Sequence, residues 1–114
     1  MDWFFTPDKP VFLQIADGIK KRILTGEYAP DSQLPSVRAI AAQTGVNPNT
    51  VQRSFVILEE QGIIVARGTV GRFVTNNKQL LKSALSNELN KETDAFLKKM
   101  RAFGISEKEI AALI

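Results

Sequence analysis

Apolar residues recur at helical spacing along three segments in the first half of the chain. Over Val11–Thr25 they stand three or four positions apart, with basic residues outside the stripe, which predicts a helix that Gly26 terminates. A second, shorter helix is expected to begin at the N-cap Ser36 and to run to about Thr44. A third is expected over about 48–61. The positions that these helices direct toward a core are Phe12, Ile15, Ile19, Ile23, Val37, Ile40, Ala41, Val51, Phe55 and Leu58.

The stretch NPNT at positions 47–50 marks the start of the third helix and not a break within one. Asparagine is a favoured N-cap residue, and a proline at the following position removes an N–H that has no intrahelical acceptor. This helix is expected to end at Gly62. Its face away from the core has no acidic residue in the first two turns and carries Asn49, Gln52, Arg53 and Val56.

The pattern changes after the third helix to short β-prone runs. Ile63–Arg67 and Arg72–Thr75 flank a glycine-containing tip, which predicts a β-hairpin. A long helix is then expected over about Leu80–Phe103, and Ser106 with Glu109 forms a capping box before a short last helix. The chain is therefore expected to be mainly α with a small β-hairpin. The apolar stripe of the long helix consists of Leu81, Leu85, Leu89, Phe96, Met100 and Phe103.

Composition narrows the function of this 114-residue chain. Cysteine and histidine are both absent, which excludes disulfides and thiolate ligands and removes the commonest general base and metal ligand. We therefore expect a protein that is not an enzyme and that holds neither a metal nor a cofactor. The amino terminus has no signal-peptide pattern and no apolar run is long enough to span a membrane, so a cytoplasmic location is expected.

The distribution of charge is more informative than the net charge of +3. Between Ser32 and Asn87 the only acidic residues are Glu59 and Glu60, which we assign to the surface at a helix end. An acid-poor block is what a surface facing nucleic-acid phosphates requires, and an ordinary solvated face is the alternative. The basic residues inside the block are Arg38, Arg53, Arg67, Arg72, Lys78 and Lys82.

Ala41, Gly45 and Val51 have the spacing of a helix-turn-helix. A small residue allows the two helices to approach closely, a glycine permits the turn, and an apolar residue anchors the second helix. The hairpin that follows extends this motif to a winged helix.

Four segments in order resemble the DNA-binding domain of GntR-family transcriptional regulators, over residues 9–75. The first helix and loop correspond to PVFLQIADGIKKRILTGEYAP, the next two helices to LPSVRAIAAQTGVNPNTVQRSFVILEEQGII, and the end of the wing to GRFV. Asp31 stands where the family usually has glycine, and Thr69-Val70 widen the wing tip. Residues 76–114 are similar to the short helical tail of the YtrA subfamily. The resemblance implies a winged helix-turn-helix DNA-binding domain, residues 1–75, and a two-helix dimerisation tail, residues 76–114.

Position and resemblance together indicate which residues meet double-stranded DNA. The start of the second helix can hold phosphates, the third helix presents its amino-terminal end to the major groove, and the wing reaches the minor groove or its phosphates. For Asn47 capping alone is an equal alternative, and Arg38, Gln52 and Arg53 have a surface-only alternative. The expected DNA-binding residues are Ser36, Val37, Arg38, Asn47, Pro48, Asn49, Thr50, Gln52, Arg53, Arg67, Gly68, Thr69 and Gly71.

The resemblance also implies a homodimeric regulator, most often a repressor, that binds an inverted-repeat operator. The apolar stripe of the tail would join the two copies through residues 77–114. Trp3, Phe4 and Phe5 are expected to pack the amino-terminal arm on the core. Two alternatives to the dimeric regulator stay open: the tail folds over these three residues and leaves a monomer, or the winged helix serves protein–protein contact without reading DNA. Whether a small-molecule effector exists also stays open, although two helices leave little room for its pocket.

Overall fold

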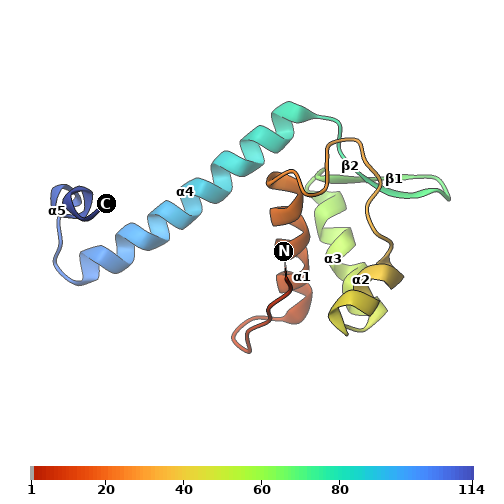
Figure 1. The fold of residues 1–114 in the computed structure, drawn as a ribbon, viewed down its shortest axis with the longest axis horizontal. Helices are drawn as coiled ribbons and strands as arrows, with labels where there is room; N and C mark the ends of the chain where they lie inside the picture. The colour runs from red at the N-terminus through yellow and green to blue at the C-terminus, as the bar shows by residue number, and fades with distance from the viewer. Residues whose placement is uncertain (1) are drawn as a thin grey trace. The chain divides into compact units, whose positions relative to one another are not determined.

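The computed structural model describes residues 2–114 and contains, within them, five helices and one two-stranded antiparallel sheet (Figure 1). The chain forms two compact units, one reaching to Lys82 and the other spanning Ser83–Ile114. The fold class expected from the sequence, mainly α with a β-hairpin, is confirmed. The elements are α1 (Val11–Leu24), α2 (Val37–Thr44), α3 (Pro48–Glu60), β1 (Ile64–Arg67), β2 (Gly71–Val74), α4 (Lys78–Ala102) and α5 (Glu107–Leu113).

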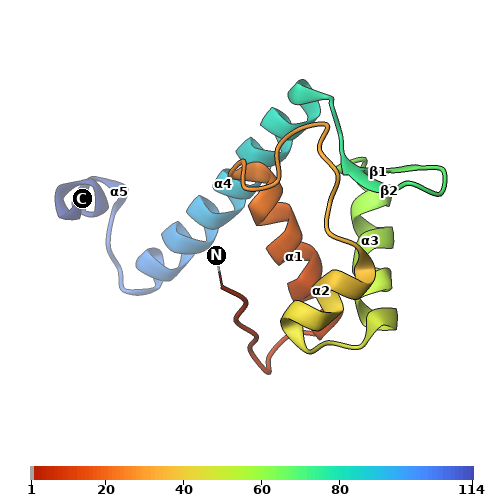
Figure 2. The same cartoon turned by 45° about the vertical axis from the view of Figure 1, so that its right-hand side comes forward.

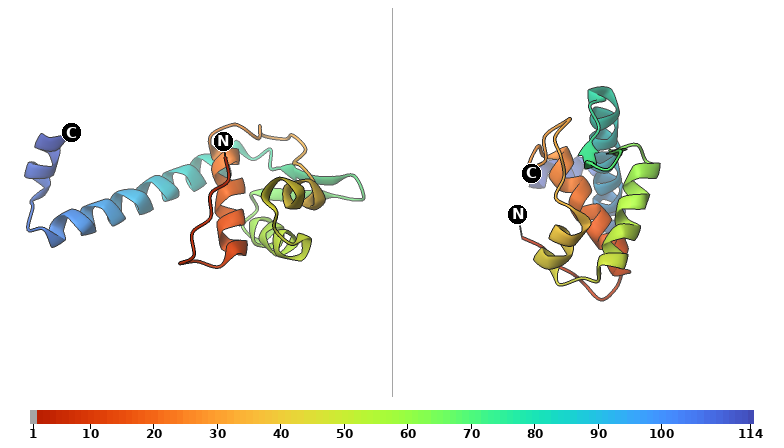
Figure 3. Two further views of the ribbon diagram at one scale, coloured as in Figure 1. Left: turned by 60° about the horizontal axis from the view of Figure 1, so that its bottom comes forward. Right: turned by 90° about the vertical axis from the view of Figure 1, so that its right-hand side faces the viewer.

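The first three helices and the hairpin share one hydrophobic core in the amino-terminal unit. α1 and α2 both pack on α3, and β1 continues from the carboxyl end of α3 with β2 beside it (Figures 2 and 3). Leu80 and Leu81, in the first turn of α4, pack on the same core, which explains why the unit extends past the hairpin. The buried apolar residues are Ile15, Ala16, Ile19, Ile23, Leu34, Ile40, Ala41, Val51, Phe55, Leu58, Ile63, Ile64 and Val74.

The expected element boundaries hold to within two residues, and the differences have local causes. Ile63 was expected in the first strand, but its N–H bonds the carbonyl of Leu58 at 3.1 Å and closes the end of α3. Gly62 has the left-handed φ of 74° that such a helix end requires. At the start of α4, the Asn77 side chain accepts a hydrogen bond of 3.0 Å from the N–H of Leu80, so the helix begins earlier than the apolar pattern alone predicts.

The loop before α2 lies along β2 and covers the edge of the hairpin. The N–H of Asp31 donates to the Val74 carbonyl at 3.1 Å, and the Val74 N–H donates back to Ser32 at 2.9 Å. Farther along, the N–H of Leu34 donates to the Arg72 carbonyl at 2.8 Å. These bonds satisfy backbone groups that an exposed edge strand would leave open, and they tie the wing to the start of α2.

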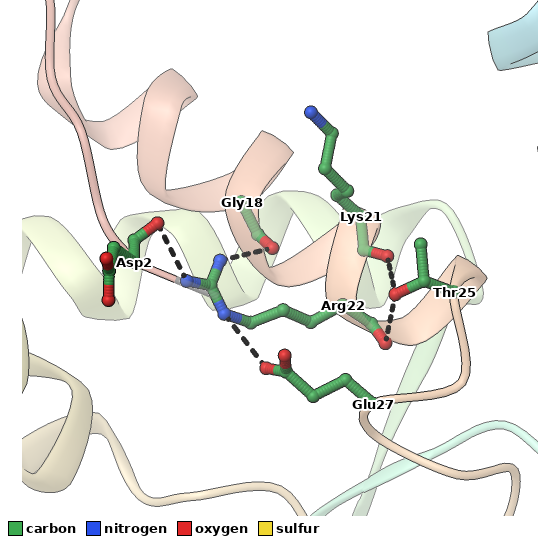
Figure 4. Close-up of polar contacts among 6 residues, drawn as sticks. All are labelled: Asp2, Gly18, Lys21, Arg22, Thr25 and Glu27. Carbon is green, nitrogen blue, oxygen red and sulfur yellow. Dashed lines mark hydrogen bonds and ion pairs between the residues drawn. The ribbon is translucent and has the colours of Figure 1, made fainter.

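The amino-terminal arm is fixed to α1 through a buried arginine (Figure 4). Arg22 is only 2% exposed, and its guanidinium lies 3.7 Å from the centroid of the Trp3 ring. It donates to the Gly18 carbonyl at 2.9 Å and pairs with Glu27 at 3.2 Å, so its charge is compensated. Trp3 therefore packs on the core as the sequence predicts. Packing of Phe4 was also expected, and this is wrong because Phe4 is 83% exposed.

The second unit consists of the rest of α4 and α5. The capping box expected at Ser106 is confirmed: its hydroxyl accepts a bond from the Glu109 N–H, and the Glu109 carboxylate accepts one from the Ser106 N–H, each at 3.2 Å. Ile110 is buried, whereas no residue of α4 is. The large apolar side chains that α4 leaves exposed are Leu85, Leu89 and Phe96. Within residues 2–114, no helix has both the length and the apolar character needed to cross a bilayer.

Candidate nucleic-acid interface

The helix-turn-helix is built by local signals at the ends of α2 and α3. The Ser36 hydroxyl accepts a hydrogen bond of 3.0 Å from the Ala39 N–H and so caps α2. Gly45 ends the helix with φ 71°, and its N–H bonds the Ala41 carbonyl at 2.9 Å. A Cβ at Gly45 would meet nothing within 4 Å, so the glycine is required by its backbone conformation and not by crowding.

The two asparagines at the amino-terminal end of α3 have different surroundings. The Asn47 side chain accepts a hydrogen bond of 2.8 Å from the backbone N–H of Asn49, with Pro48 as the first helical residue. Asn47 is therefore the N-cap, as the sequence predicts. The Asn49 side chain is exposed and makes no hydrogen bond to any residue of 2–114, so it is available to a ligand.

The inner face of α3 is locked onto α1. Ser54 is fully buried, and its hydroxyl donates to the Phe12 carbonyl at 2.6 Å while also lying 3.2 Å from the Thr50 carbonyl. Val51 and Phe55 pack in the core on either side of it. This attachment determines which face of α3 points outward, since a helix fixed along one side cannot rotate.

On the outward face of α3, Arg53 lies over the ring of Phe12, with its guanidinium 3.6 Å from the ring centroid. Phe12 was expected in the core, but it is only half-buried and provides a platform for this arginine. A stacked guanidinium keeps its charge and most of its N–H donors available while losing rotamer freedom.

The wing contacts α3 through Arg72 on β2. Its Nε donates to the Glu59 carboxylate at 3.1 Å, its Nη1 donates to Oε1 of Gln52 at 3.1 Å, and its guanidinium lies 5.2 Å from the Phe55 ring centroid. The assignment of Glu59 as a simple surface charge is wrong: it is half-buried and paired. Sequence reasoning did not connect these residues, because 13 and 20 positions separate Arg72 from its two partners.

The tip of the wing is tied to the loop before α2. Arg67 pairs with Asp31 and lies 4.2 Å from the Phe73 ring centroid. The side-chain amide of Gln33 donates to the Val70 carbonyl at 2.8 Å, and a Cβ on Gly71 would approach that amide nitrogen to 2.8 Å. The tip residues, including Gly68 (φ 53°) and Thr69, are exposed.

Asp31 has a left-handed φ of 63°, the conformation for which glycine is best suited. The departure from the family pattern at this position therefore keeps the backbone shape. Its carboxylate supplies the partner of Arg67, which a glycine would not.

A groove of about 310 Å³ opens between the start of α2, the middle of α3 and the wing. Of the residues expected to bind DNA, it brings together Ser36, Val37, Arg38, Gln52 and Gly71. The remaining ones lie outside its lining, at the amino-terminal end of α3 and at the wing tip. The residues lining the groove are Gln33, Leu34, Pro35, Ser36, Val37, Arg38, Gln52, Phe55, Val70, Gly71 and Arg72.

The arginines around the groove differ in how their charge is compensated. Arg67 and Arg72 each pair with a carboxylate, whereas Arg38 and Arg53 have no acidic partner among residues 2–114. Arg38 is exposed at the first turn of α2, beside backbone N–H groups that the helix itself leaves unpaired. Among residues 2–114, no three His, Cys, Asp or Glu side chains lie close enough together to hold a metal ion.

A helix-turn-helix whose second helix leads directly into a β-hairpin is a winged helix-turn-helix, a DNA-binding class. Residues 12–74, more than half of the chain, match the model of the gntR family of bacterial regulatory proteins. The chain belongs to this family, as the sequence resemblance indicated: it is a DNA-binding transcriptional regulator and not an enzyme.

One relative extends the match to nearly the whole chain, and another matches over about the length of the winged helix. The HTH-type transcriptional regulator YhcF of Bacillus subtilis is 39% identical over 111 residues, which cover 96% of this chain and 91% of YhcF. The HTH-type transcriptional repressor YtrA of the same organism is 37% identical over 68 residues, 60% of this chain and 52% of YtrA.

Solved structures agree with the observed fold. A GntR family transcriptional regulator from Listeria monocytogenes superimposes with a TM-score of 0.92 at 33% identity, over 96% of both chains. The DNA-binding domain of AraR in complex with operator ORX1 superimposes with a TM-score of 0.59 at 25% identity, over 66% of this chain and 95% of that domain.

Proposed function

We propose that this regulator is a cytoplasmic repressor that binds an inverted-repeat operator as a homodimer. The observation that carries the proposal is the joint presentation of the Arg38 guanidinium, the outward face of α3 and the wing around one groove. In a winged helix these three elements can meet phosphates, major-groove base edges and the neighbouring minor groove together. Two relatives support the proposal by what their names state: YtrA is a repressor, and the AraR domain is bound to an operator.

Specific roles follow from the surroundings of each residue. Ser36, Val37 and Arg38 hold a phosphate at the start of α2, where the helix leaves backbone N–H groups unpaired and the Arg38 side chain is exposed. Asn49, whose side chain has no hydrogen-bond partner among residues 2–114, contacts a base edge. Pro48, Thr50 and Arg53 flank it on the same end of α3, and Arg67, Gly68, Thr69 and Gly71 form the part of the wing that approaches the backbone.

The second unit supplies the reason to expect a dimer. α4 is a 25-residue helix without a buried residue, and Leu89 on it is 57% exposed. Farther along the chain, α4 and α5 line a mostly apolar groove of about 450 Å³ that includes Phe96, Leu97 and Ile110. An unpartnered apolar surface of this kind is stabilised in water when a second copy covers it, and two-fold symmetry then sets two recognition helices a fixed distance apart.

Selection of bound sequences from a random duplex pool, together with sedimentation of the full chain, tests the proposal. We expect two half-sites in inverted orientation and a dimer at micromolar concentration. Leu89→Glu should yield monomers and weaken operator binding steeply, because the half-sites are no longer linked. Asn87→Glu, which adds the same charge on the opposite side of α4, should leave the dimer intact.

A selected site without inverted symmetry, or a wild-type chain that sediments as a monomer and binds one half-site, would contradict the dimer. Repression is tested separately, by placing the selected site over a promoter that drives a reporter. Higher expression in the presence of the protein than in its absence would show an activator instead.

A further inference from the structure

Gln52 on the outward face of α3 is held by a side chain of the wing. Oε1 of Gln52 accepts a hydrogen bond of 3.1 Å from Nη1 of Arg72. Arg72 is itself fixed on its other side, because its Nε donates to the Glu59 carboxylate at 3.1 Å and its guanidinium lies over the Phe55 ring. Both members of the Arg72–Glu59 pair are half-buried, so neither moves freely in solvent.

This contact decides which end of the Gln52 amide points away from the protein. A guanidinium has only donors, so the amide must present its oxygen to Arg72, and the opposite arrangement would set two donor groups against each other. The Nε2 amino group, with two N–H donors, is then the end left for a ligand. Gln52 is exposed, so this amino group is accessible at the groove between α3 and the wing.

A fixed donor changes what a glutamine recognises in DNA. A freely rotating Gln pairs with adenine by accepting from N6 and donating to N7, so it uses both ends of its amide. With the oxygen held by Arg72, the amide acts as a donor, and guanine is the base whose major-groove edge offers two adjacent acceptors, N7 and O6, whereas thymine offers one acceptor beside a methyl group.

We propose that Arg72 and Glu59 are positioning residues that orient the Gln52 amide as a hydrogen-bond donor and so direct it to a guanine in each half-site. The inference rests on the proposed function, in which the outward face of α3 contacts base edges. Phe55 contributes by supporting the Arg72 guanidinium from the core side. The competing role for Arg72 is direct binding of a phosphate, which carries no base preference.

The test uses the full-length protein and sequence selection from a random duplex pool. Gln52→Ala identifies the base pair that Gln52 contacts, as the position where preference disappears. At this position we expect guanine for the wild type. Arg72→Met, which keeps an apolar stem over Phe55 but has no donor, should admit adenine and lower the preference for guanine over adenine about tenfold.

Two neighbouring glutamates provide a matched pair of variants that test the base preference at the base pair contacted by Gln52. Glu59→Ala and Glu60→Ala remove the same charge from the end of α3, but only Glu59 contacts Arg72. Glu59→Ala should therefore weaken the guanine preference, while Glu60→Ala should leave it unchanged. Thermal unfolding of each variant separates a lost preference from a lost fold, and Arg72→Lys provides a second donor-bearing variant that should retain part of the preference.

The outcomes are distinguishable. If Arg72→Met lowers affinity equally for all sequences and reduces the salt dependence by one contact, Arg72 binds phosphate and the inference is wrong. An adenine preference in the wild type, or an unchanged guanine preference in both Arg72→Met and Glu59→Ala, also overturns it. If the inference fails in one of these ways, a base preference that depends on Asn49 still supports the proposed function. If the wild-type protein selects no sequence at all, the inference and the proposed function are both wrong.

Discussion

The guanidinium of Arg53 on α3 lies 3.6 Å from the centroid of the Phe12 ring on α1. Phe12 begins an apolar helical stripe, yet its ring is half-buried and supports a cation at the surface. Their contact links α1 to the outward face of α3. An arginine stacked in this way is preorganised, so it loses less entropy when it binds a phosphate or a base.

Replacing the ring should therefore weaken DNA binding without removing a charge. We expect Phe12→Leu, which keeps an apolar side chain, to lower operator affinity by about 0.5–1 kcal/mol, the range of an exposed cation–π contact. Fluorescence anisotropy with the selected operator measures the change. Leu13→Ala, at an exposed position of the same helix, is the control. Equal affinity of Phe12→Leu and wild type would show that the stacking has no role in binding.

The two asparagines at the start of α3 should separate stability from recognition. Asn47→Ala removes the N-cap and should lower the free energy of unfolding by about 1 kcal/mol. Asn49→Ala breaks no hydrogen bond within residues 2–114 and should instead relax the preference for one base in each half-site, at a cost of about 1–3 kcal/mol in binding. Chemical denaturation and sequence selection measure the two effects. If both variants keep the base preference of the wild type, this end of α3 does not contact the bases.

The Arg67–Asp31 pair should set the salt dependence of DNA binding. Arg67→Ala should lower affinity and reduce the slope of log affinity against log salt by about one phosphate contact. Asp31→Gly suits the left-handed backbone but releases Arg67 from its partner, so it should raise affinity at low salt and steepen the same slope. Titrations at several salt concentrations decide this. Identical slopes in both variants and the wild type would exclude the wing tip from the interface.

Arg38 is the second electrostatic test, because it has no acidic partner among residues 2–114. We expect Arg38→Ala to weaken operator binding by about 1–3 kcal/mol, while the free energy of unfolding changes little. The salt slope then distinguishes its target. A slope reduced by about one contact indicates a phosphate, and an unchanged slope with altered base preference indicates a base.

Gly18 provides the surface on which the arm rests. A Cβ at this position would lie 2.3 Å from a ring carbon of Trp3, so Gly18→Ala should displace the indole and its contact with Arg22. Alanine favours the helix by about 1 kcal/mol, so overall stability should change little. Trp3 is the only tryptophan, and its emission should shift to longer wavelength. Asp17→Ala, an exposed neighbour, should not shift it.

The compact amino-terminal unit predicts where the chain can be shortened. Leu80 and Leu81 pack on the core and lie after the hairpin, so a fragment ending at Lys82 should keep the stability of the winged helix. A fragment ending at Thr75 lacks both side chains and should be less stable by roughly 1–3 kcal/mol. Urea denaturation of the two fragments measures the difference. Equal midpoints would show that the first turn of α4 contributes nothing to the core.

The helices, the hairpin and the fold class follow from local signals along the chain. Ser36, Asn47 and Ser106 cap helices through hydrogen bonds to backbone groups two or three residues away, and Gly45 permits a turn by its own conformation. Such interactions involve neighbours along the chain, so spacing and residue type are sufficient to predict them. The same is true of the apolar stripe of α3, which follows from helical periodicity.

The contacts that connect the candidate interface depend instead on how the elements pack. The loop before α2 pairs with β2, Asp31 meets Arg67 from 36 residues away, and Arg72 joins Gln52 to Glu59. No local pattern specifies these contacts, because each joins residues that lie far apart in the sequence and meet only in the packed fold. Phe12 shows the same limit: its apolar character predicts burial, but the packing of α3 on α1 leaves its ring at the surface beneath Arg53. Side chains far apart in sequence acquire their partners from packing, so their roles are fixed by the fold and not by the pattern that produced it.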